Sequence, residues 1–306
     1  MISGRLNKNR RAVAGAAIAC AAAAGIALML TNTRLGVYIL LDYFGDDESG
    51  IVTDPASGPL ELSEFRTAVA AYALPPQIDQ PSGMTYLEAD SAFAIVTDQA
   101  ELYVISDDFT TVRSITALAG GLLVTRQGLM EAAGSIDGQR IAVSGETGRI
   151  DIWRKDAEPG FSPEATIDLS GFAGEGEFSG IAHNPQTGEY FLSSDETLTI
   201  AVVDATGRLV RELTFEDDLR GRLKPHRSLS EYQLSGLDYA DGRLYAVSEP
   251  YNTLFIIDPE HGLLRILGIE NGGQISAIAV LNRTAYLPLD HNYVDERPPL
   301  LTVTLD

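Results

Sequence analysis

The chain alternates short apolar runs with turn residues from about Pro75 to its end. The runs are four to six residues long, and glycine, aspartate, asparagine or proline separates them. This pattern is typical of short β-strands joined by tight turns, and no long stretch has the period of an amphipathic helix. The body of the chain is therefore predicted to be all-β.

One strand pattern recurs five times along this body. Each unit has a small or acidic residue before an apolar strand, then a second strand that ends near an acidic residue, then a further strand. The units begin 49, 48, 56 and 41 residues apart, at Ser82, Glu131, Ser179, Ser235 and Ser276. Such spacing suits four strands per unit, the size of a propeller blade. The sequence thus predicts a five-bladed β-propeller.

The strands nearest the axis are predicted to open with glycine, because a side chain there would collide with the next blade. These inner strands are Gly83–Tyr86, Gly180–His183 and Gly236–Tyr239. The predicted second strands are Phe93–Thr97, Tyr190–Ser193 and Leu244–Val247, and the third strands are Leu102–Ile105 and Leu254–Ile257. Tight turns at Asp204–Gly207 and Asp258–Gly262 suit the hairpins before the outermost strands.

The fifth unit is one strand short, since the chain ends after the run LLTVTLD. Residues 62–73 hold the candidate strand upstream of the first unit. We expect them to pair with the last blade and close the ring, which removes exposed sheet edges. Residues 45–61 are rich in Gly, Asp, Ser and Pro and are predicted to be a spacer. The predicted propeller domain covers 62–306, after a juxtamembrane segment and linker over 31–61.

Residues 12–30 form an uninterrupted apolar run of 19 residues. As a helix this run would be roughly 28 Å long, close to the ~30 Å hydrocarbon core of a bilayer. The preceding residues 1–11 carry four basic side chains, which favours a cytoplasmic N-terminus. We predict a single-pass anchor in a bacterial inner membrane, with the propeller in the periplasm.

Two other interpretations of this apolar run stay open. A cleaved signal peptide would have a shorter apolar core, and the segment after residue 30 remains apolar, which argues against cleavage. Lipidation of Cys20 would require a lipoprotein box, to which Ala17-Ile18-Ala19 is only loosely similar. Cys20 is the single cysteine, so a disulfide within one chain and a cysteine-based zinc site are excluded.

Charge narrows the choice of partners. The formal net charge is −21, from 43 acidic and 22 basic residues, and five of the basic residues fall in residues 1–34. An acidic body repels phosphate backbones, which excludes nucleic acid as a partner and leaves divalent cations and basic partners open. The most basic stretch of the body, RGRLKPHRS at 220–228, is predicted to be a solvated loop, with an acidic partner or lipid headgroups as the alternative.

Four segments of the chain resemble the SdiA-regulated family, the YjiK-like proteins. They are LPPQIDQPSGMTY (74–86), FAIVTDQAELYVI (93–105), SGIAHNPQTGEYFL (179–192) and LSGLDYADGRLYAVSEPYNTLFIID (234–258). The resemblance covers about residues 72–306. It implies a membrane-anchored N-terminus, a five-bladed propeller distantly similar to the NHL type, and a calcium site on the acidic central face.

Two rings of positions are predicted to face the propeller axis. One is the residue before each inner strand: Ser82, Glu131, Ser179, Ser235 and Ser276. The other follows each second strand: Asp98, Glu146, Asp195 with Glu196, Glu249, and Asp290. Calcium takes six to eight oxygen ligands, which carboxylates from several blades could supply.

The candidate metal ligands are Glu131, Glu146, Asp195, Glu196, Glu249 and Asp290. Glu131 is the sharpest of them, because its ring is otherwise serine. The family pattern has glutamate where this chain has Ser179 and Ser276, which predicts weakened calcium affinity. The alternative role of these carboxylates is that of solvated turn residues or strand caps.

No catalytic residue is predicted. The chain lacks a Gly-x-Ser-x-Gly elbow, and its four histidines are scattered over different units, with His183 on an inner strand. We therefore expect a binding module that takes a small ligand or a protein at the propeller face. The alternative is a calcium-dependent hydrolase that resembles the lactonase-like propellers.

Overall fold

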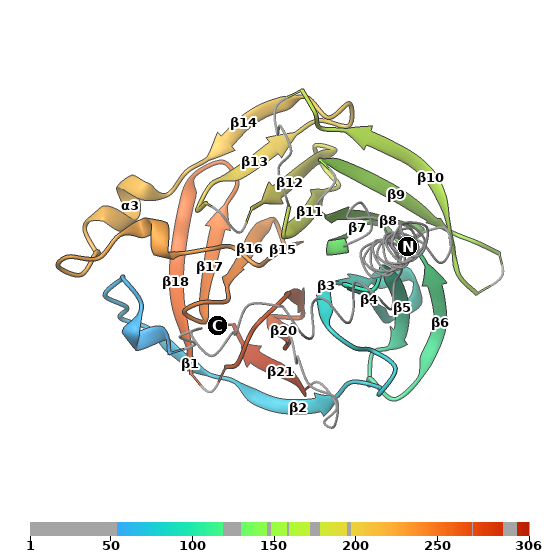
Figure 1. The fold of residues 1–306 in the computed structure, drawn as a ribbon, viewed down its shortest axis with the longest axis horizontal. Helices are drawn as coiled ribbons and strands as arrows, with labels where there is room; N and C mark the ends of the chain where they lie inside the picture. Colours follow the sequence, from blue (N-terminus) through green and yellow to red (C-terminus); the bar gives the residue numbers. More distant parts are fainter. Residues whose placement is uncertain are drawn as a thin grey trace, which may run out of the picture. The chain divides into compact units, whose positions relative to one another are not determined.

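The computed structural model describes residues 54–118, 130–145, 148–157, 159–171, 178–194, 197–270, 272–289 and 299–305. Five β-sheets form a ring, and the inner strands of neighbouring sheets contact one another around the whole circle (Figure 1). The predicted five-bladed propeller is confirmed. The predicted membrane helix, 12–30, lies outside the described residues, and no helix within them is long and apolar enough to cross a membrane.

The first three blades each use four consecutive antiparallel strands, ordered from the axis outward. Blade 1 consists of β3 (Pro81–Leu87), β4 (Ala92–Thr97), β5 (Glu101–Ser106) and β6 (Val112–Ala117). Blade 2 consists of β7 (Met130–Asp137), β8 (Arg140–Gly145), β9 (Arg149–Lys155) and β10 (Phe161–Asp168). Blade 3 consists of β11 (Gly180–Asn184), β12 (Glu189–Ser193), β13 (Ile200–Val203) and β14 (Leu209–Leu213).

The last two blades each gain a strand from the N-terminal side of the chain. Blade 4 consists of β15 (Gly236–Ala240), β16 (Arg243–Ser248), β17 (Thr253–Asp258) and β18 (Gly262–Glu270), with β1 (Phe65–Thr67) added. Blade 5 consists of β19 (Ala279–Leu281), β20 (Thr284–Pro288), β21 (Pro299–Thr304) and β2 (Val69–Ala73). The helical turns are η2 (Pro55–Ser57), η3 (Glu88–Asp90), α3 (Glu216–Arg220) and η5 (Leu229–Glu231).

Strands β1 and β2 close the ring. Strand β2 pairs antiparallel with β21, which is the pairing predicted for residues 62–73. Strand β1 also pairs with β18, in parallel, and the sequence analysis did not predict this contact. Every residue of β2 is exposed, whereas Ala68 and Leu74 at its two ends are buried. The closing strand therefore contributes backbone hydrogen bonds, and the residues that flank it contribute apolar burial.

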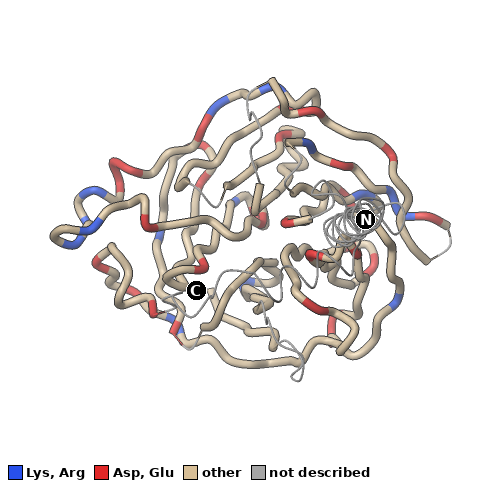
Figure 2. The backbone as a smooth tube through the Cα atoms, in the orientation of Figure 1, with Lys and Arg blue, Asp and Glu red and all other residues tan. Residues whose placement is uncertain are grey.

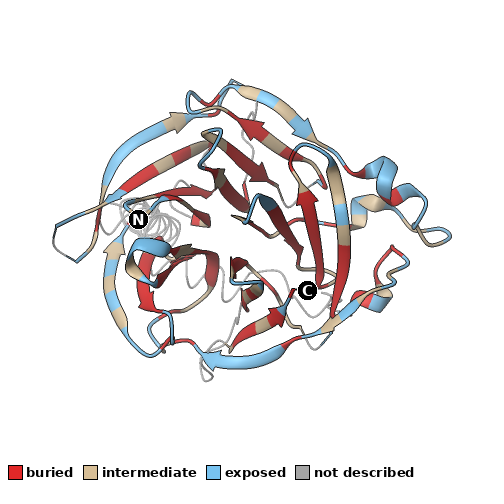
Figure 3. Ribbon diagram, turned by 180° about the vertical axis from the view of Figure 1, so that it is seen from behind, coloured by how far each residue is buried: buried red, intermediate tan, exposed pale blue. Residues whose placement is uncertain are grey.

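The core lies between the blades. Inner and second strands are buried along most of their length, and outer strands alternate or face solvent (Figure 3). The reason is that inner strands have a neighbouring blade on both faces. Five apolar clusters occupy the five interfaces between adjacent blades. The predicted role of the inner-strand glycines is confirmed: a Cβ on Gly236 would lie 2.9 Å from the Cα of Ala277 in the next blade.

Residues 54–61 pack on blade 4, which corrects the prediction of a spacer over 45–61 at its C-terminal end. Leu60 is fully buried and forms an isolated β-bridge with Leu223. Gly58 lies against Tyr251 in the β16–β17 turn. Leu60 belongs to the apolar cluster between blades 3 and 4, and this cluster assembles only when the ring folds.

The basic stretch after α3 forms the other half of this contact (Figure 2). Lys224 donates hydrogen bonds to the carbonyl oxygens of Ala56 and Gly58, at 2.5 and 2.7 Å. Arg227 forms an ion pair with Glu231 at 2.5 Å and contacts Tyr251. Lys224 and Arg227 thus bind groups of the protein itself, so this stretch is less solvated than predicted.

Candidate functional site

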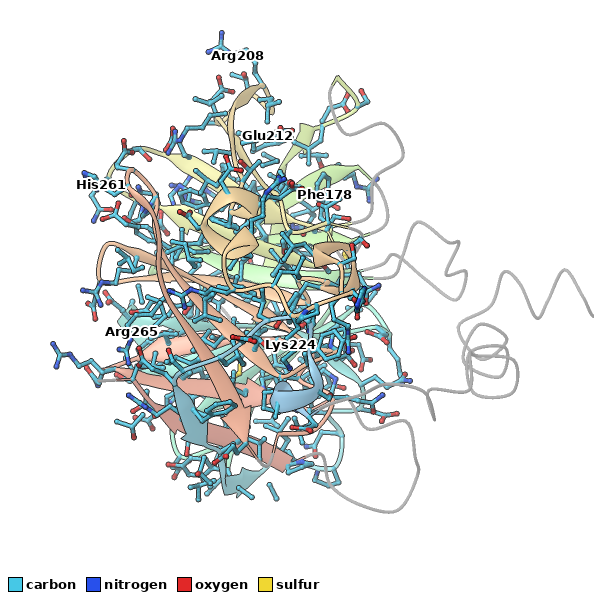
Figure 4. The ribbon with its side chains drawn as sticks, turned by 90° about the vertical axis from the view of Figure 1, so that its left-hand side faces the viewer. Phe178, Arg208, Glu212, Lys224, His261 and Arg265 are labelled. Carbon is cyan, nitrogen blue, oxygen red and sulfur yellow. The ribbon has the colours of Figure 1, made fainter. Side chains whose placement is uncertain are left out.

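The propeller axis carries a pocket at each end. A cavity of about 170 Å³, the serine-ring pocket, lies where the inner strands begin. A cavity of about 700 Å³, the wide pocket, lies where the inner strands turn into the second strands. The side view places Phe178, before β11, and His261, in the β17–β18 turn, toward opposite ends of the ring (Figure 4). Between the pockets, small residues such as Gly83 and Ala133 leave no room for a water molecule.

The serine-ring pocket gathers the predicted ring positions. It is lined by all five members of the first ring and by Asp98 and Glu249 of the second ring. Glu131 and Glu249 are thus the two candidate metal ligands that the structure brings to one pocket. The other four, Glu146, Asp195, Glu196 and Asp290, lie outside the described residues.

The ring serines join successive blades through hydrogen bonds. In each case the hydroxyl donates to the carbonyl of the residue just before the next ring position. The bonds run from Ser82 to Met130 at 2.6 Å, from Ser179 to Leu234 at 2.5 Å, from Ser235 to Ile275 at 2.9 Å, and from Ser276 to Pro81. The last of them spans the closure between blade 5 and blade 1.

This arrangement gives the serines a structural role that the sequence analysis missed. Ser179 and Ser276 stand where the resemblance implies metal-binding carboxylates, and their hydroxyl protons form hydrogen bonds between blades. Glu131 occupies the same position in blade 2, where an ionised carboxylate accepts hydrogen bonds and donates none. The signal in the sequence was the repetition of serine itself at four of the five positions.

Within the described parts of the chain, no three His, Cys, Asp or Glu side chains gather in a way that could hold a metal ion. Glu131 and Glu249 share the pocket without forming such a group. The calcium site therefore stays a prediction from the resemblance and from the residue pattern.

The wide pocket is lined from all five blades and is mainly polar. Its acidic and basic members are four carboxylates and one histidine, namely Glu88, Asp137, Asp238, Asp241 and His183. No lysine or arginine is among its described lining residues. The sequence analysis noted that His183 could face the channel, and the structure places it here, but the analysis missed the pocket as a site.

Asp238 lies on inner strand β15 and is almost fully buried, with 8% of its surface exposed. Its Oδ2 accepts a hydrogen bond from the backbone N–H of Val280 at 2.6 Å. Burial raises the pKa of Asp238 to about 7, although hydrogen bonds from the backbone of Val280 and Tyr239 act in the opposite direction. The carboxyl therefore changes charge near neutral pH.

A signal for Asp238 was present in the repeats. The equivalent position, three residues after each ring position, holds Thr85, Gly134, Ala182 and Ala279 in the other blades. Thr85 makes the same contact as Asp238, because its hydroxyl accepts a hydrogen bond from the N–H of Ser135 in the next blade. An ionisable residue therefore occupies a position that elsewhere takes a small one.

His183 lies in the wall of the wide pocket. Burial lowers its pKa, and a hydrogen bond to the Ile136 backbone only partly opposes this, so the ring is neutral at pH 7. The ring packs on Tyr190, with centroids 4.8 Å apart. Its Nδ1 is buried and has no hydrogen-bond partner among the described residues. Leaving such an acceptor unpaired costs about 1–3 kcal/mol.

Asp238 is expected to make stability fall as pH rises from about 4 to about 7. Its pKa is higher in the folded protein than in the unfolded chain, so the folded state binds more protons in this window, and the cost of burying the charge is complete above pH 7. The loss is on the order of 4 kcal/mol. Urea unfolding across this range should show the slope in the wild type, and Asp238→Asn should flatten it.

Other acidic groups do not imitate this effect. Hydrogen bonds lower the pKa values of Asp108, Asp204 and Glu231 to about 2. Their contribution to the stability of the protein is therefore lost only as pH falls below about 4. An identical pH dependence in Asp238→Asn and in the wild type would contradict the assignment.

Comparisons with known proteins show the fold alone. No protein-family model matches the chain, and no curated protein matches it. Among solved structures, the glutaminyl cyclase of Myxococcus xanthus is similar with a TM-score of 0.57 and 18% identity, over 80% of this chain and 100% of that one. The structure of U3-55K also matches, with a TM-score of 0.45 and 15% identity, over 72% of this chain and 61% of that one. The WD40 repeats of RRP9 match with a TM-score of 0.46 and 10% identity, over 77% of this chain and 97% of that one. At 18% identity, the likeness to the glutaminyl cyclase shows a shared fold.

Proposed function

We propose that this protein is a binding module of the cell envelope. The helix predicted over residues 12–30 would anchor it in the inner membrane, and the propeller would lie in the periplasm. In this proposal the wide pocket holds a small ligand. Fold does not decide function here, because propellers support many roles, so the proposal rests on the pocket.

The observation that carries the proposal is the size and closure of the wide pocket. Its volume of about 700 Å³ falls within the ~300–1,000 Å³ typical of ligand sites. It ends blindly, because the small residues of the inner strands close the axis behind it. All five blades contribute to its wall, so one bound molecule could contact every repeat.

Calcium binding is a separate proposal that concerns the serine-ring pocket. It depends on Glu131 and Glu249, which line that pocket, and on the four candidate ligands that lie outside the described residues. The calcium-dependent hydrolase remains the alternative function. Turnover of esters or lactones that a chelator abolishes would favour it over the binding module.

A screen by ligand-observed NMR tests the binding module. The full-length protein in detergent micelles is mixed with small metabolites of every charge class, and compounds that bind are tested again with Gln186→Trp. Gln186 is exposed and lines the wide pocket, so a bulky ring there should obstruct binding without unfolding the blade. Affinity is expected to fall by about tenfold or more, which is ~1.4 kcal/mol.

The matched control is Glu212→Trp on the outer strand β14, which should leave binding unchanged (Figure 4). If no compound binds, or if both tryptophan variants bind every compound as the wild type does, the wide pocket is not a ligand site and the proposal is wrong.

A further inference from the structure

We propose that the wide pocket selects a small organic cation that carries N–H donors, such as a primary amine. This inference rests on the proposed function, since it names the ligand class of the same pocket. It is carried by three observations: the charge of the wall, the two tyrosines in it, and a volume too large for a bare ion.

The wall of the pocket is negative. Asp137 is paired with Arg140 at 2.8 Å, so its charge is largely compensated. The other carboxylates of the wall are Glu88 of blade 1, Asp241 of blade 4 and Asp238 of blade 4. Asp238 accepts a hydrogen bond from the backbone of Val280 in blade 5. With no lysine or arginine among the described lining residues, a positive ligand would meet the attraction of carboxylates from several blades.

The other members of the wall favour a cation over an anion. Burial lowers the pKa of His183, so its ring adds no positive charge at pH 8. Tyr86 and Tyr239 add aromatic surface, and aromatic rings attract cations through their negative faces. Anionic ligands gain neither the attraction of the carboxylates nor that of the rings.

The size of the pocket separates an organic cation from a metal ion. A cavity of about 700 Å³ has room for a molecule with a carbon skeleton. A metal ion would need several ligand oxygens drawn close together, and no such group of acidic or histidine side chains occurs within the described residues. The charge and the volume together therefore favour an amine.

Calorimetric titration with three four-carbon probes tests the ligand class. The full-length protein is titrated at pH 8, where Asp238 is ionised, with 1,4-diaminobutane, 1,4-butanediol and succinate. The diamine is expected to bind at least about tenfold more tightly than the diol, and succinate least of all, since a hydrogen bond to a charged group is worth about a tenfold change or more.

Two isosteric variants place the effect in the pocket. Asp238→Asn and Asp241→Asn should each weaken diamine binding by about tenfold, whereas Glu212→Gln, which removes one charge from the outer strand β14, should not. Thermal unfolding of each variant at the same pH checks that the ring is intact.

The outcomes separate the two proposals. If the diol or succinate binds as tightly as the diamine, or if the compounds blocked by Gln186→Trp are mainly anionic, the ligand class is wrong while the binding module stands. If nothing binds in the titrations and nothing binds in the NMR screen, the binding module itself fails.

Discussion

Replacing Phe93 with alanine is expected to lower the free energy of unfolding by about 3–5 kcal/mol. Phe93 is fully buried on β4, between blade 1 and blade 5. The centroid of its ring lies 4.8 Å from the ring centroid of Phe109 and 4.9 Å from those of Tyr86 and Tyr286. The substitution removes the centre of an aromatic cluster and leaves a cavity at the interface where the ring closes.

Chemical denaturation measures this loss, with Ile115→Ala as the control. Ile115 lies on the outer strand β6 and is 52% exposed, so its truncation should cost less than about 1 kcal/mol. Equal losses for the two variants would show that the closure interface has no special share in stability.

Replacing Gly83 with alanine is expected to destabilise the protein by about 3 kcal/mol, at the upper end of the range for overpacking. A Cβ at this position would lie 2.5 Å from the backbone nitrogen of Ala133 and 2.7 Å from the carbonyl carbon of Ala132. These atoms belong to the inner strand of blade 2. A side chain could rotate away, but backbone in a closed ring can move only by displacing the neighbouring blades.

Gly171→Ala is the matched control. A Cβ on Gly171 would meet no atom of the described residues within 4 Å, and its φ is not in the left-handed region, so the change should be neutral or stabilise by up to about 1 kcal/mol. Thermal unfolding of the two variants checks the difference. A Gly83→Ala protein as stable as Gly171→Ala would mean that inner strands tolerate side chains at the axis.

The repeat pattern was sufficient for the architecture. The predicted inner, second and third strands lie within the observed ones, and residues 62–73 contain the strand that completes blade 5. This was possible because strand formation and turns depend on local alternation, and because five copies of one unit leave few ways to bury their apolar faces. The role of the inner-strand glycines was predictable for the same reason, since each lies where the backbones of two neighbouring blades approach closely.

The contacts between repeats could not be read in this way. Nothing local tells that Ser235 donates to the carbonyl of Ile275, or that Leu60 is buried beside Leu223. Such pairs are separated by tens to hundreds of residues and meet only after the ring has closed. The charge of a residue likewise does not predict its partner. Lys224, for example, binds the backbone carbonyl oxygens of Ala56 and Gly58 and, among the described residues, no carboxylate.

The sequence by itself determined the all-β propeller, its five repeats, its closing segment and the convergence of the first ring of positions at one end of the axis. The tertiary structure decided which end has room for a ligand. The depth of a pocket depends on how closely five inner strands approach and on how their hairpins splay, and both are set by packing between blades. That packing buries Asp238 and His183 in the wall of the larger pocket, and burial changes their chemistry.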